Sequence, residues 1–170
     1  MPISDTMILN ILIEPDELLH KVANNIDVNE IKSEKIQQLI ANLKETMRSQ
    51  DNGAGIAATQ VGELAQVCII EKEFTTEKND DLVLINPQWQ KASILRGWDE
   101  EGCFSVPGIY GRVKRYKKIK VQALDENGNK MEFIADNFLA RIIQHEVDHL
   151  NGILFIEKAK DLHKYEKEIM

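Results

Sequence analysis

Apolar residues recur with helical spacing in the first third of the chain. Between about Asn29 and Gln50 they lie three or four positions apart and form one stripe of an amphipathic helix, namely Ile36, Leu39, Ile40, Leu43 and Met47. The turn-forming sequence Asp-Asn-Gly at 51–53 should end this helix. A shorter helical signal opens near Pro15, where Asp16 can cap residues 17–19. The pattern therefore predicts a short helix followed by a long amphipathic one.

A second helical segment, from about Asn137 to Asn151, is apolar most of the way round. One row along it holds Phe138, Ile142, His145 and His149, and the next row holds Leu139, Ile143, Glu146 and Leu150. Its polar stripe consists of Asn137, Arg141, Gln144 and Asp148. Asp136 can cap its start, and Asn151-Gly152 can end it. Such a helix belongs in a core, so its two histidines and its glutamate are carried into the interior at a desolvation cost that needs a reason.

Short β-branched runs and period-two alternation predict strands between these helices. The candidates are residues 66–71, 82–86 (ended by Pro87), 118–124 and 130–134, with a hairpin turn at 125–128. Residues 71–81 are charged and are expected to form a loop. Strands gathered before one late helix predict an α+β fold, and we expect one domain spanning residues 1–170, in which 157–170 form a charged C-terminal tail or helix.

Composition narrows the range of ligands and compartments. The chain has 170 residues and a formal net charge of −7, which repels phosphate backbones and anionic lipid. Nucleic acid and membrane are therefore poor candidates for a main ligand. Its two cysteines are too few for a disulfide-stabilised secreted domain and favour a reducing compartment. Because neither a signal peptide nor an apolar run of about 18 residues is found, we expect a soluble cytoplasmic protein.

The sequence His-Glu-Val-Asp-His at 145–149 offers the reason for the buried polar groups. Two histidines four positions apart lie on one helical face, where both can bind the same metal ion, and Glu146 between them can reach a water at that ion. The alternative is an exposed helix with two incidental histidines, which the apolar neighbours disfavour. A catalytic site generally has three protein ligands, so a third is needed.

The third ligand can be sought on both sides of the motif. Metzincin proteases would place a histidine at position 155, where this chain has Phe155, and Glu166 or Glu168 lies in a charged segment that should be solvated. Cys103 is the better candidate, because Gly102 before it gives the backbone freedom to present the sulfur. A core or surface thiol is the alternative. Cys68, inside an apolar strand, is more simply a small buried hydrophobe.

The run of small residues at 53–62 contains Gln60, a side-chain amide donor. Small residues allow the backbone to approach a ligand closely. A tight turn is the commoner meaning of such a run, and the alternative for Gln60 is that it only holds this loop in shape. Alone, this segment is therefore a weak indication of a site.

Three segments in fixed order, GAGIAATQ (53–60), EGCFS (101–105) and QHEVDH (144–149), closely resemble the peptide deformylase family over about residues 8–156. The resemblance implies antiparallel strands wrapped around a metal-bearing helix and an enzyme that removes the formyl group from the N-terminal methionine of new polypeptides. It also implies a metal held by Cys103, His145 and His149, with Fe²⁺ native and Zn²⁺, Ni²⁺ or Co²⁺ able to replace it. Phe104 departs from the family's frequent leucine.

The same resemblance implies roles for further residues. Glu146 would act as general base, while the Gln60 side chain and the Phe104 backbone N–H would stabilise the charge on the carbonyl oxygen. Gly55 and Gly102 would pair with the substrate backbone. Positions supporting the metal ligands are Glu101, Arg115, Gln144 and Asp148. Phe138 and Ile142 share a row with His145, so we expect them to line the methionine pocket, with plain core packing as the alternative.

Two other functions remain open from the sequence. One is a metallopeptidase that cleaves internal peptide bonds, which would need a third ligand other than Cys103. The other is a non-catalytic metal-binding module, which would need a fourth ligand, and neither His20 nor His163 has a suitable spacing. The expected partners are formyl-Met nascent polypeptides, with transient ribosome contact and without sequence-specific nucleic acid or membrane.

Overall fold

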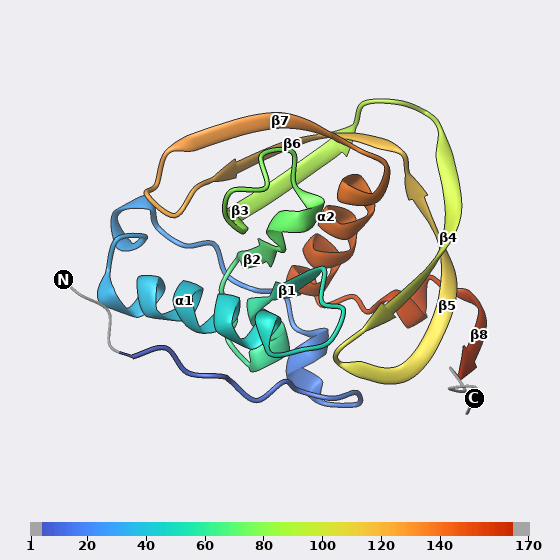
Figure 1. The fold of residues 1–170 in the computed structure, drawn as a ribbon, viewed down its shortest axis with the longest axis horizontal. Helices are drawn as coiled ribbons and strands as arrows, with labels where there is room; N and C mark the ends of the chain where they lie inside the picture. Colours follow the sequence, from blue (N-terminus) through green and yellow to red (C-terminus); the bar gives the residue numbers. More distant parts are fainter. Residues whose placement is uncertain (1–4, 165–170) are drawn as a thin grey trace.

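Two antiparallel sheets and two α-helices make up residues 5–164, the part of the chain that the computed structural model describes (Figure 1). The larger sheet has the order β1-β2-β3-β6-β7 and the smaller one β4-β5-β8. The strands are β1 (Gly55–Ala57), β2 (Val67–Ile70), β3 (Leu82–Lys91), β4 (Arg96–Cys103), β5 (Val106–Tyr116), β6 (Lys118–Leu124), β7 (Lys130–Asp136) and β8 (Lys160–Lys164). The α-helices are α1 (Glu34–Arg48) and α2 (Asn137–Leu150), and the 3-10 helices are η1 (Glu17–His20), η2 (Val28–Glu30), η3 (Ala58–Val61), η4 (Lys72–Phe74) and η5 (Phe155–Glu157). The prediction of a mixed fold with antiparallel strands is confirmed.

The two α-helices pack against different faces of the larger sheet. β2 is buried on both sides, and its residues alternate between the two helices because side chains of a strand point to opposite faces. Ile69 packs in the same cluster as Ile40 and Leu43 of α1, which confirms the predicted apolar stripe. Ile70 packs in the cluster that contains Ile143 of α2. The sheet is therefore the middle layer between α1 and α2.

α2 contacts strands of both sheets, and Figure 1 shows it inside the curve that the strands describe. Most of its polar stripe is covered too, because Arg141, Gln144 and Asp148 are buried, whereas Asn137 and Phe138 in its first turn are exposed. Asp136 occupies the predicted N-cap position, although its side chain makes no capping hydrogen bond. The placement of this helix in the core is confirmed.

Several predicted boundaries are wrong for identifiable physical reasons. α1 begins at Glu34 and not near Asn29, because Ser33 caps it and η2 precedes it as a separate turn. The signal near Pro15 is a single 3-10 turn, η1, which Asp16 caps. β3 continues past Pro87 to Lys91, with a register irregularity between Ile85 and Gln88 that accommodates the proline.

Larger differences concern the smaller sheet. β4 and β5 were not predicted at all, and they pair along nearly their whole length. Residues 160–164 form strand β8 beside β5, where a charged tail or helix was predicted, and residues 165–170 lie outside the described part. Within residues 5–164, no helix combines the length and the apolar character needed to cross a membrane.

Candidate metal centre

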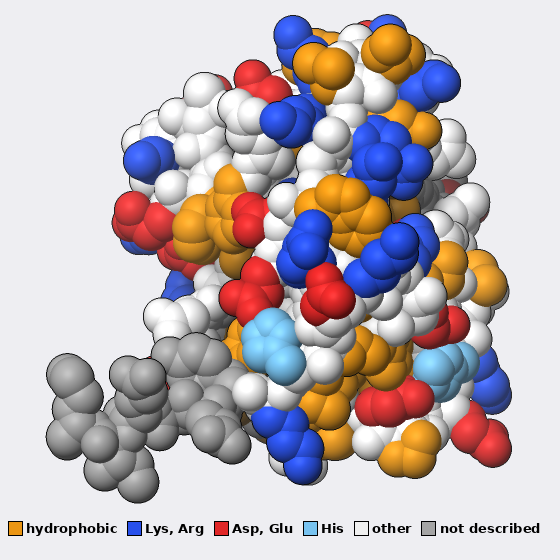
Figure 2. All heavy atoms as spheres, turned by 90° about the vertical axis from the view of Figure 1, so that its right-hand side faces the viewer, with side chains coloured by type: hydrophobic (Ala, Val, Ile, Leu, Met, Phe, Trp, Pro, Cys, Tyr) orange, Lys and Arg blue, Asp and Glu red, His pale blue; other side chains and the backbone are white. Residues whose placement is uncertain are grey.

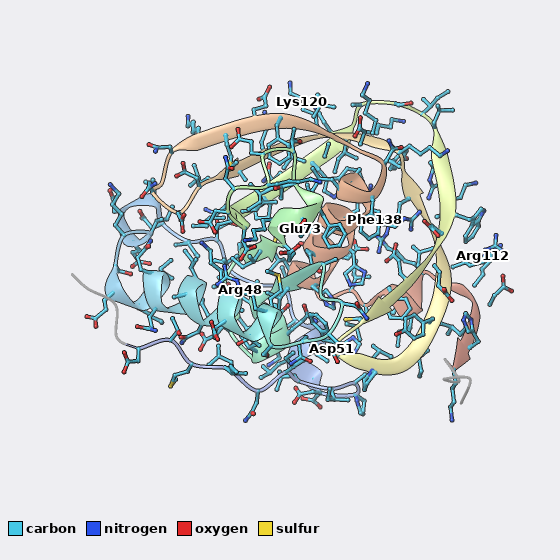
Figure 3. All side chains as sticks on the ribbon, in the orientation of Figure 1. Arg48, Asp51, Glu73, Arg112, Lys120 and Phe138 are labelled. Atoms are coloured by element: carbon cyan, nitrogen blue, oxygen red, sulfur yellow. The ribbon has the colours of Figure 1, made fainter. Side chains whose placement is uncertain are left out.

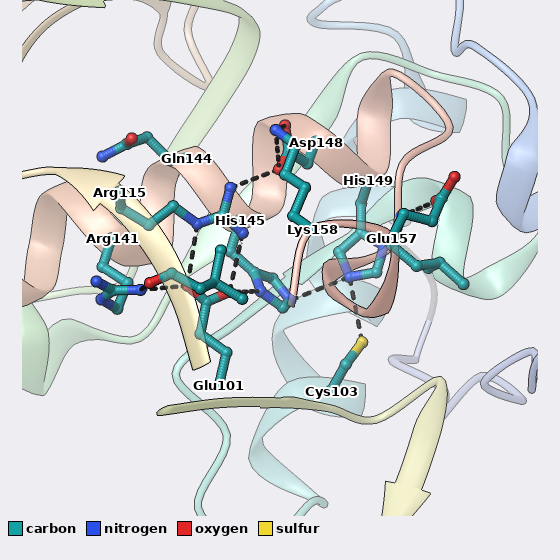
Figure 4. Close-up of polar contacts among 12 residues, drawn as sticks. Glu101, Cys103, Arg115, Arg141, Gln144, His145, Asp148, His149, Glu157 and Lys158 are labelled. Carbon is teal, nitrogen blue, oxygen red and sulfur yellow. Dashed lines mark hydrogen bonds and ion pairs between the residues drawn. The ribbon is translucent and has the colours of Figure 1, made fainter. Parts of the chain in front are cut away.

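The end of β4 and one face of α2 bring three metal-binding side chains together. The candidate ligand atoms of Cys103, His145 and His149 all lie within 4.8 Å of one another. The Cys103 sulfur is 3.2 Å from Nε2 of His149, which is 3.2 Å from Nε2 of His145 (Figure 4). Cys103 is the last residue of β4, so the strand delivers its sulfur to the helix. The structure thus assembles the three residues that the sequence singled out.

A buried carboxylate fixes the orientation of His145. Nδ1 of His145 lies 2.8 Å from Oε1 of Glu101, which leaves Nε2 facing His149. Glu101 also accepts hydrogen bonds from two nitrogens of Arg115, both at 2.9 Å, and from Arg141 at 2.6 Å. Arg115 continues to Asp148, which also binds Lys158. Such outer hydrogen bonds hold a ligating histidine in one tautomer and one ring position.

Of the four residues predicted to support the metal ligands, three belong to this hydrogen-bond network and one does not. Glu101, Arg115 and Asp148 belong to this network, whereas Gln144 bonds the backbone N–H and carbonyl of Tyr116 and ties α2 to the end of β5. Arg141 was assigned only to a polar helical stripe, yet it joins the network through Glu101. The sequence signal for this role is its spacing of four residues from His145, which places both side chains on one face of the helix.

Electrostatics in the cluster favour a positive charge at its centre. Burial lowers the pKa of His145, but hydrogen bonds with Cys103 and Glu101 outweigh burial and raise it to about 10. Burial and the charge on His145 lower the pKa of His149 well below its usual value. Although burial acts the other way, hydrogen bonds from Arg115 and His145 hold the pKa of Glu101 well below its usual range. Neighbouring anionic groups thus draw a cation to the two imidazole rings.

Glu146 lies beside the cluster in a dry setting. It is buried, and its Oε2 has no hydrogen-bond partner among the described residues. Burial raises its pKa to about 7, against the attraction of charged His145. A Cβ added to Gly55 would lie 3.0 Å from both Glu146 Oε1 and the Ile69 carbonyl oxygen, so a larger residue would have to push its neighbours aside.

Gln60 reaches the cluster from η3. Its Oε1 accepts a hydrogen bond from the backbone N–H of Ala57 at 2.9 Å, which fixes which way the amide points. Its Nε2 faces the Cys103 sulfur at 3.4 Å and Ser105 Oγ at 3.2 Å. Ser105 is fully buried and was not singled out from the sequence, where a serine two residues after a cysteine carries no signal. Gln60 is therefore placed to hold its loop and to face the site.

Two glycines of the predicted motifs, Gly53 and Gly102, pack against aromatic rings near the cluster. Phe104 follows Cys103, and its ring lies so close to Gly53 that an added Cβ would meet it at 2.6 Å. Gly102 lies under the ring of Tyr110, where an added Cβ would meet the ring at 2.5 Å. These contacts account for two glycines of the motifs by close packing.

Phe138 and Ile142 differ sharply in exposure. Ile142 is buried in the core cluster beside α2, so core packing describes its contacts. Phe138 is 47% exposed, and its ring meets that of Phe74 edge-on at a centroid distance of 5.1 Å. Figure 3 shows Phe138 at the open side of α2, near the η4 segment. Phe74 lies in residues 71–81, which were predicted to form a charged loop, and it ends the 3-10 helix η4.

The residues present suit a divalent metal. One thiol and two imidazoles are the donor set that borderline transition ions prefer, and a three-ligand set leaves one position open. The two imidazole nitrogens lie 3.2 Å apart, where both can face one cation, and Oε2 of the buried Glu146 lacks a hydrogen-bond partner in residues 5–164. The cluster and its surroundings fit an ion in chemistry and in charge.

Fold and site first define a class: a mixed α/β protein in which a buried cysteine–histidine–histidine cluster, with a carboxylate beside it, lies where a helix meets an edge strand. Comparison with known proteins then identifies the family. The polypeptide deformylase family model matches residues 8–165, and the chain belongs to this family.

Individual relatives cover most of the chain. A peptide deformylase of Neisseria meningitidis is 43% identical over 155 residues, 91% of this chain and 89% of the relative. Peptide deformylase 3 of Shewanella oneidensis is 44% identical over 156 residues, 91% of each chain. Among solved structures, the Met-Ala-Ser-bound class I type b enzyme of Acinetobacter baumannii has a TM-score of 0.83 at 35% identity and covers 91% of this chain and 99% of its own. The Synechococcus elongatus enzyme with actinonin has a TM-score of 0.80 at 36% identity and covers 90% and 79%.

Proposed function

We propose that this protein removes the formyl group from the N-terminal methionine of newly made polypeptides, using one divalent ion held by Cys103, His145 and His149. The observation that carries the proposal is the convergence of the three donor atoms within 4.8 Å, two from the helix α2 and one from the end of strand β4. Fe²⁺ is the native ion in this proposal, and Zn²⁺, Ni²⁺ or Co²⁺ can replace it because borderline ions share this donor set. Family membership supports the reaction class.

Glu146 handles the protons of the reaction. A divalent ion held by the three ligands supplies Lewis acidity, which lowers the pKa of water from about 16 to about 7. Glu146 takes a proton from the attacking water and later returns it to the departing amine. Its pKa of about 7, which burial raises, suits a group that must both accept and give a proton near neutral pH.

Gln60 and Phe104 stabilise the negative charge that collects on the formyl oxygen. The Gln60 Nε2 lies 3.4 Å from the Cys103 sulfur, so it can donate to an oxygen held beside the ligands. The backbone N–H of Phe104 lies one residue beyond the cysteine and supplies the second donor. Loss of one donor of this kind typically costs about 10²–10³ in rate.

The substrate backbone pairs with edge strands. β1 and β4 each lie at the edge of a sheet, and Gly55 and Gly102 sit on them beside the metal centre. An extended peptide can add to such an edge through backbone hydrogen bonds. Phe138, whose side chain is exposed, contacts the methionine side chain, and Ile142 on the same helix row lines the inner side of the pocket. The Met-Ala-Ser-bound structure of a relative supports the binding of a peptide.

Formyl selectivity follows from the close wall that Gly53 and Gly55 form against Phe104 and Glu146. A formyl carbon bears only hydrogen, whereas an acetyl group adds a methyl that this wall should exclude, at a typical cost of about 1–3 kcal/mol. The partners are nascent chains in the cytoplasm, with a transient contact to the ribosome that makes them.

The test is release of formate from formyl-Met-Ala by anaerobically prepared, iron-loaded protein, with acetyl-Met-Ala alongside. We expect formate release and cleavage of the acetyl peptide at least tenfold slower, the rate equivalent of about 1.4 kcal/mol. Equal rates on the two peptides, or cleavage of an internal peptide bond without formate release, would contradict the proposal in favour of a general peptidase.

A further inference from the structure

The outer face of the β4–β5–β8 sheet gathers cations around aromatic rings. Arg112, Lys114 and Lys160 lie 5.5, 5.9 and 5.1 Å from the centre of the Trp98 ring. Strand register explains the grouping, since Trp98 is opposite Lys114 and Arg112 is opposite Lys160. Figure 2 shows this side of the molecule, with hydrophobic side chains bordered by Lys and Arg, and Figure 3 shows Arg112 pointing away from the body.

Carboxylates leave most of this charge uncompensated. Arg112 is paired with Asp161 at 3.1 Å, and Glu100 on the same face is taken by His163 at 2.6 Å. No ion pair is found for Arg96, Lys114 or Lys160 within residues 5–164; Arg96 lies over the Tyr116 ring at 5.0 Å. A protein of net charge −7 thus presents one locally cationic face.

A hollow of about 390 Å³ opens on the same face. Aromatic rings and basic side chains line it together with two buried polar groups, namely Trp89, Trp98, Tyr116, Arg96, Lys114, Lys158, Arg115 and Gln144. Lys158 is bound to Asp148 at 3.0 Å, and Arg115 is 4% exposed. The hollow therefore offers flat apolar surfaces flanked by positive charge.

We propose that this face, defined by Arg96, Trp98, Arg112, Lys114 and Lys160, is a docking surface for single-stranded RNA. Aromatic rings that stack bases beside cations that neutralise phosphates are the combination that binds single strands without sequence preference. The choice of RNA rests on the proposed function, because nascent polypeptides are made on an RNA surface. An anionic lipid surface is less suited: apart from Ile94 and Leu95 in the neighbouring turn and Leu162 on β8, the described part of the face offers rings surrounded by cations.

The five residues that define the docking surface lie on the face of the β4–β5–β8 sheet that points away from the metal centre, and the hollow beside them reaches inward to Arg115 and Gln144. Trp98 and Lys114 alternate along their strands with Gly97, Asp99, Val113 and Arg115, and Glu101 and Arg115 point inward to α2. RNA bound outside would therefore leave the approach to Cys103 open. Docking and catalysis should be separable by mutation.

Intrinsic fluorescence reports on this site directly, because the only two tryptophans of the chain, Trp89 and Trp98, both line the hollow. The experiment titrates the full-length, metal-loaded protein with a short oligouridylate and follows tryptophan quenching, with the anisotropy of a labelled oligonucleotide as a second readout. The test variant is Lys114→Gln/Lys160→Gln. The matched control is Lys32→Gln/Lys35→Gln, which removes two exposed lysines near the start of α1.

We expect saturable quenching at about 50 mM salt and weakening as salt rises. The test variant should bind about tenfold more weakly, and the slope of log K against log salt should shrink by roughly 1.4, because two phosphate contacts are lost at about 0.7 each. The control variant should bind as the wild type does. Formate release should stay unchanged in both variants, so failure of the proposed function would show there and not in RNA binding.

Three results would overturn the proposal: no quenching or anisotropy change with oligouridylate, equal weakening in both variants, or binding only to the corresponding deoxyoligonucleotide. Vesicles containing anionic lipid serve as the competing surface. The proposal would also be overturned if the vesicles bound the wild type but not the test variant, and oligouridylate bound neither protein. The face would then be a docking surface for anionic lipid.

Discussion

At the scale of single residues, Gln60 makes the contacts that both of its predicted tasks require, holding its loop and facing the metal ligands. Its amide oxygen holds the backbone N–H of Ala57, and its amide nitrogen faces the Cys103 sulfur. Removing the amide leaves a buried N–H unsatisfied, which typically costs about 1–3 kcal/mol. A stability loss in a Gln60 variant therefore says nothing against a catalytic role.

A matched pair of substitutions separates the two tasks. Gln66 is also buried and donates to the backbone carbonyls of Ala23 and Leu150, at 3.0 and 3.2 Å, and no hydrogen bond from it to a candidate metal ligand side chain is found within residues 5–164. We expect Gln60→Leu and Gln66→Leu to lose comparable unfolding free energy in denaturant titrations. Only Gln60→Leu should also lower kcat, by about 10²–10³-fold, since only it removes a donor to the formyl oxygen. Equal kcat values in the two folded variants would leave Gln60 a purely structural residue.

At the scale of elements, the β4–β5 hairpin holds the metal centre through Glu101. This carboxylate is buried and joins Arg115, Arg141 and His145. Glu101→Gln removes the charge that these groups share and should cost about 3–5 kcal/mol of unfolding free energy, the usual effect of breaking a buried ion pair.

The neighbouring Glu100 provides the control for this prediction. It lies on the same strand but faces solvent and pairs with the exposed His163. Glu100→Gln should change the unfolding midpoint little, because exposed ion pairs contribute little. A small change for Glu101→Gln as well would mean that the hairpin is held by its backbone pairing alone.

The elements also show where sequence patterns succeed. β6 has its predicted bounds, 118–124, because buried Ile119, Val121 and Ala123 alternate with exposed residues and give a clear period of two. β4 and β5 lack that signal: the inward positions of the hairpin include Glu101 and Arg115, which are buried as an ion pair. A polar interior erases the alternation from which strands are predicted.

The candidate site follows the same rule. Cys103, His145 and His149 could be singled out because their residue types and spacing are tied to metal chemistry. Ser105 and Arg141 could not, since their tasks depend on partners 45 and 40 residues away in the chain. The pocket role of Phe138 and Ile142 stays a prediction.

At the scale of the whole molecule, net charge conceals an uneven distribution. The formal value of −7 argues against a polyanionic partner, yet the face around Trp98 is cationic. Lys160, part of that face, lies in residues 157–170, for which the sequence predicts a tail or helix. β8 pairs with β5, and this pairing places Lys160 opposite Arg112. No local sequence pattern predicts it.

In the proposed reaction, β4 and α2 supply the ligands of the ion, and Glu146 moves the protons. The most direct measurement records metal content and formate release from formyl-Met-Ala in the same preparations of Glu146→Gln and Cys103→Ser. We predict that Glu146→Gln keeps its metal and loses at least about 10²-fold in kcat, since general acid–base catalysis contributes about 10²–10⁴-fold, while Cys103→Ser loses metal and activity together. Near-normal turnover by Glu146→Gln would contradict its role in proton transfer, and full metal content in Cys103→Ser would contradict its role as a ligand.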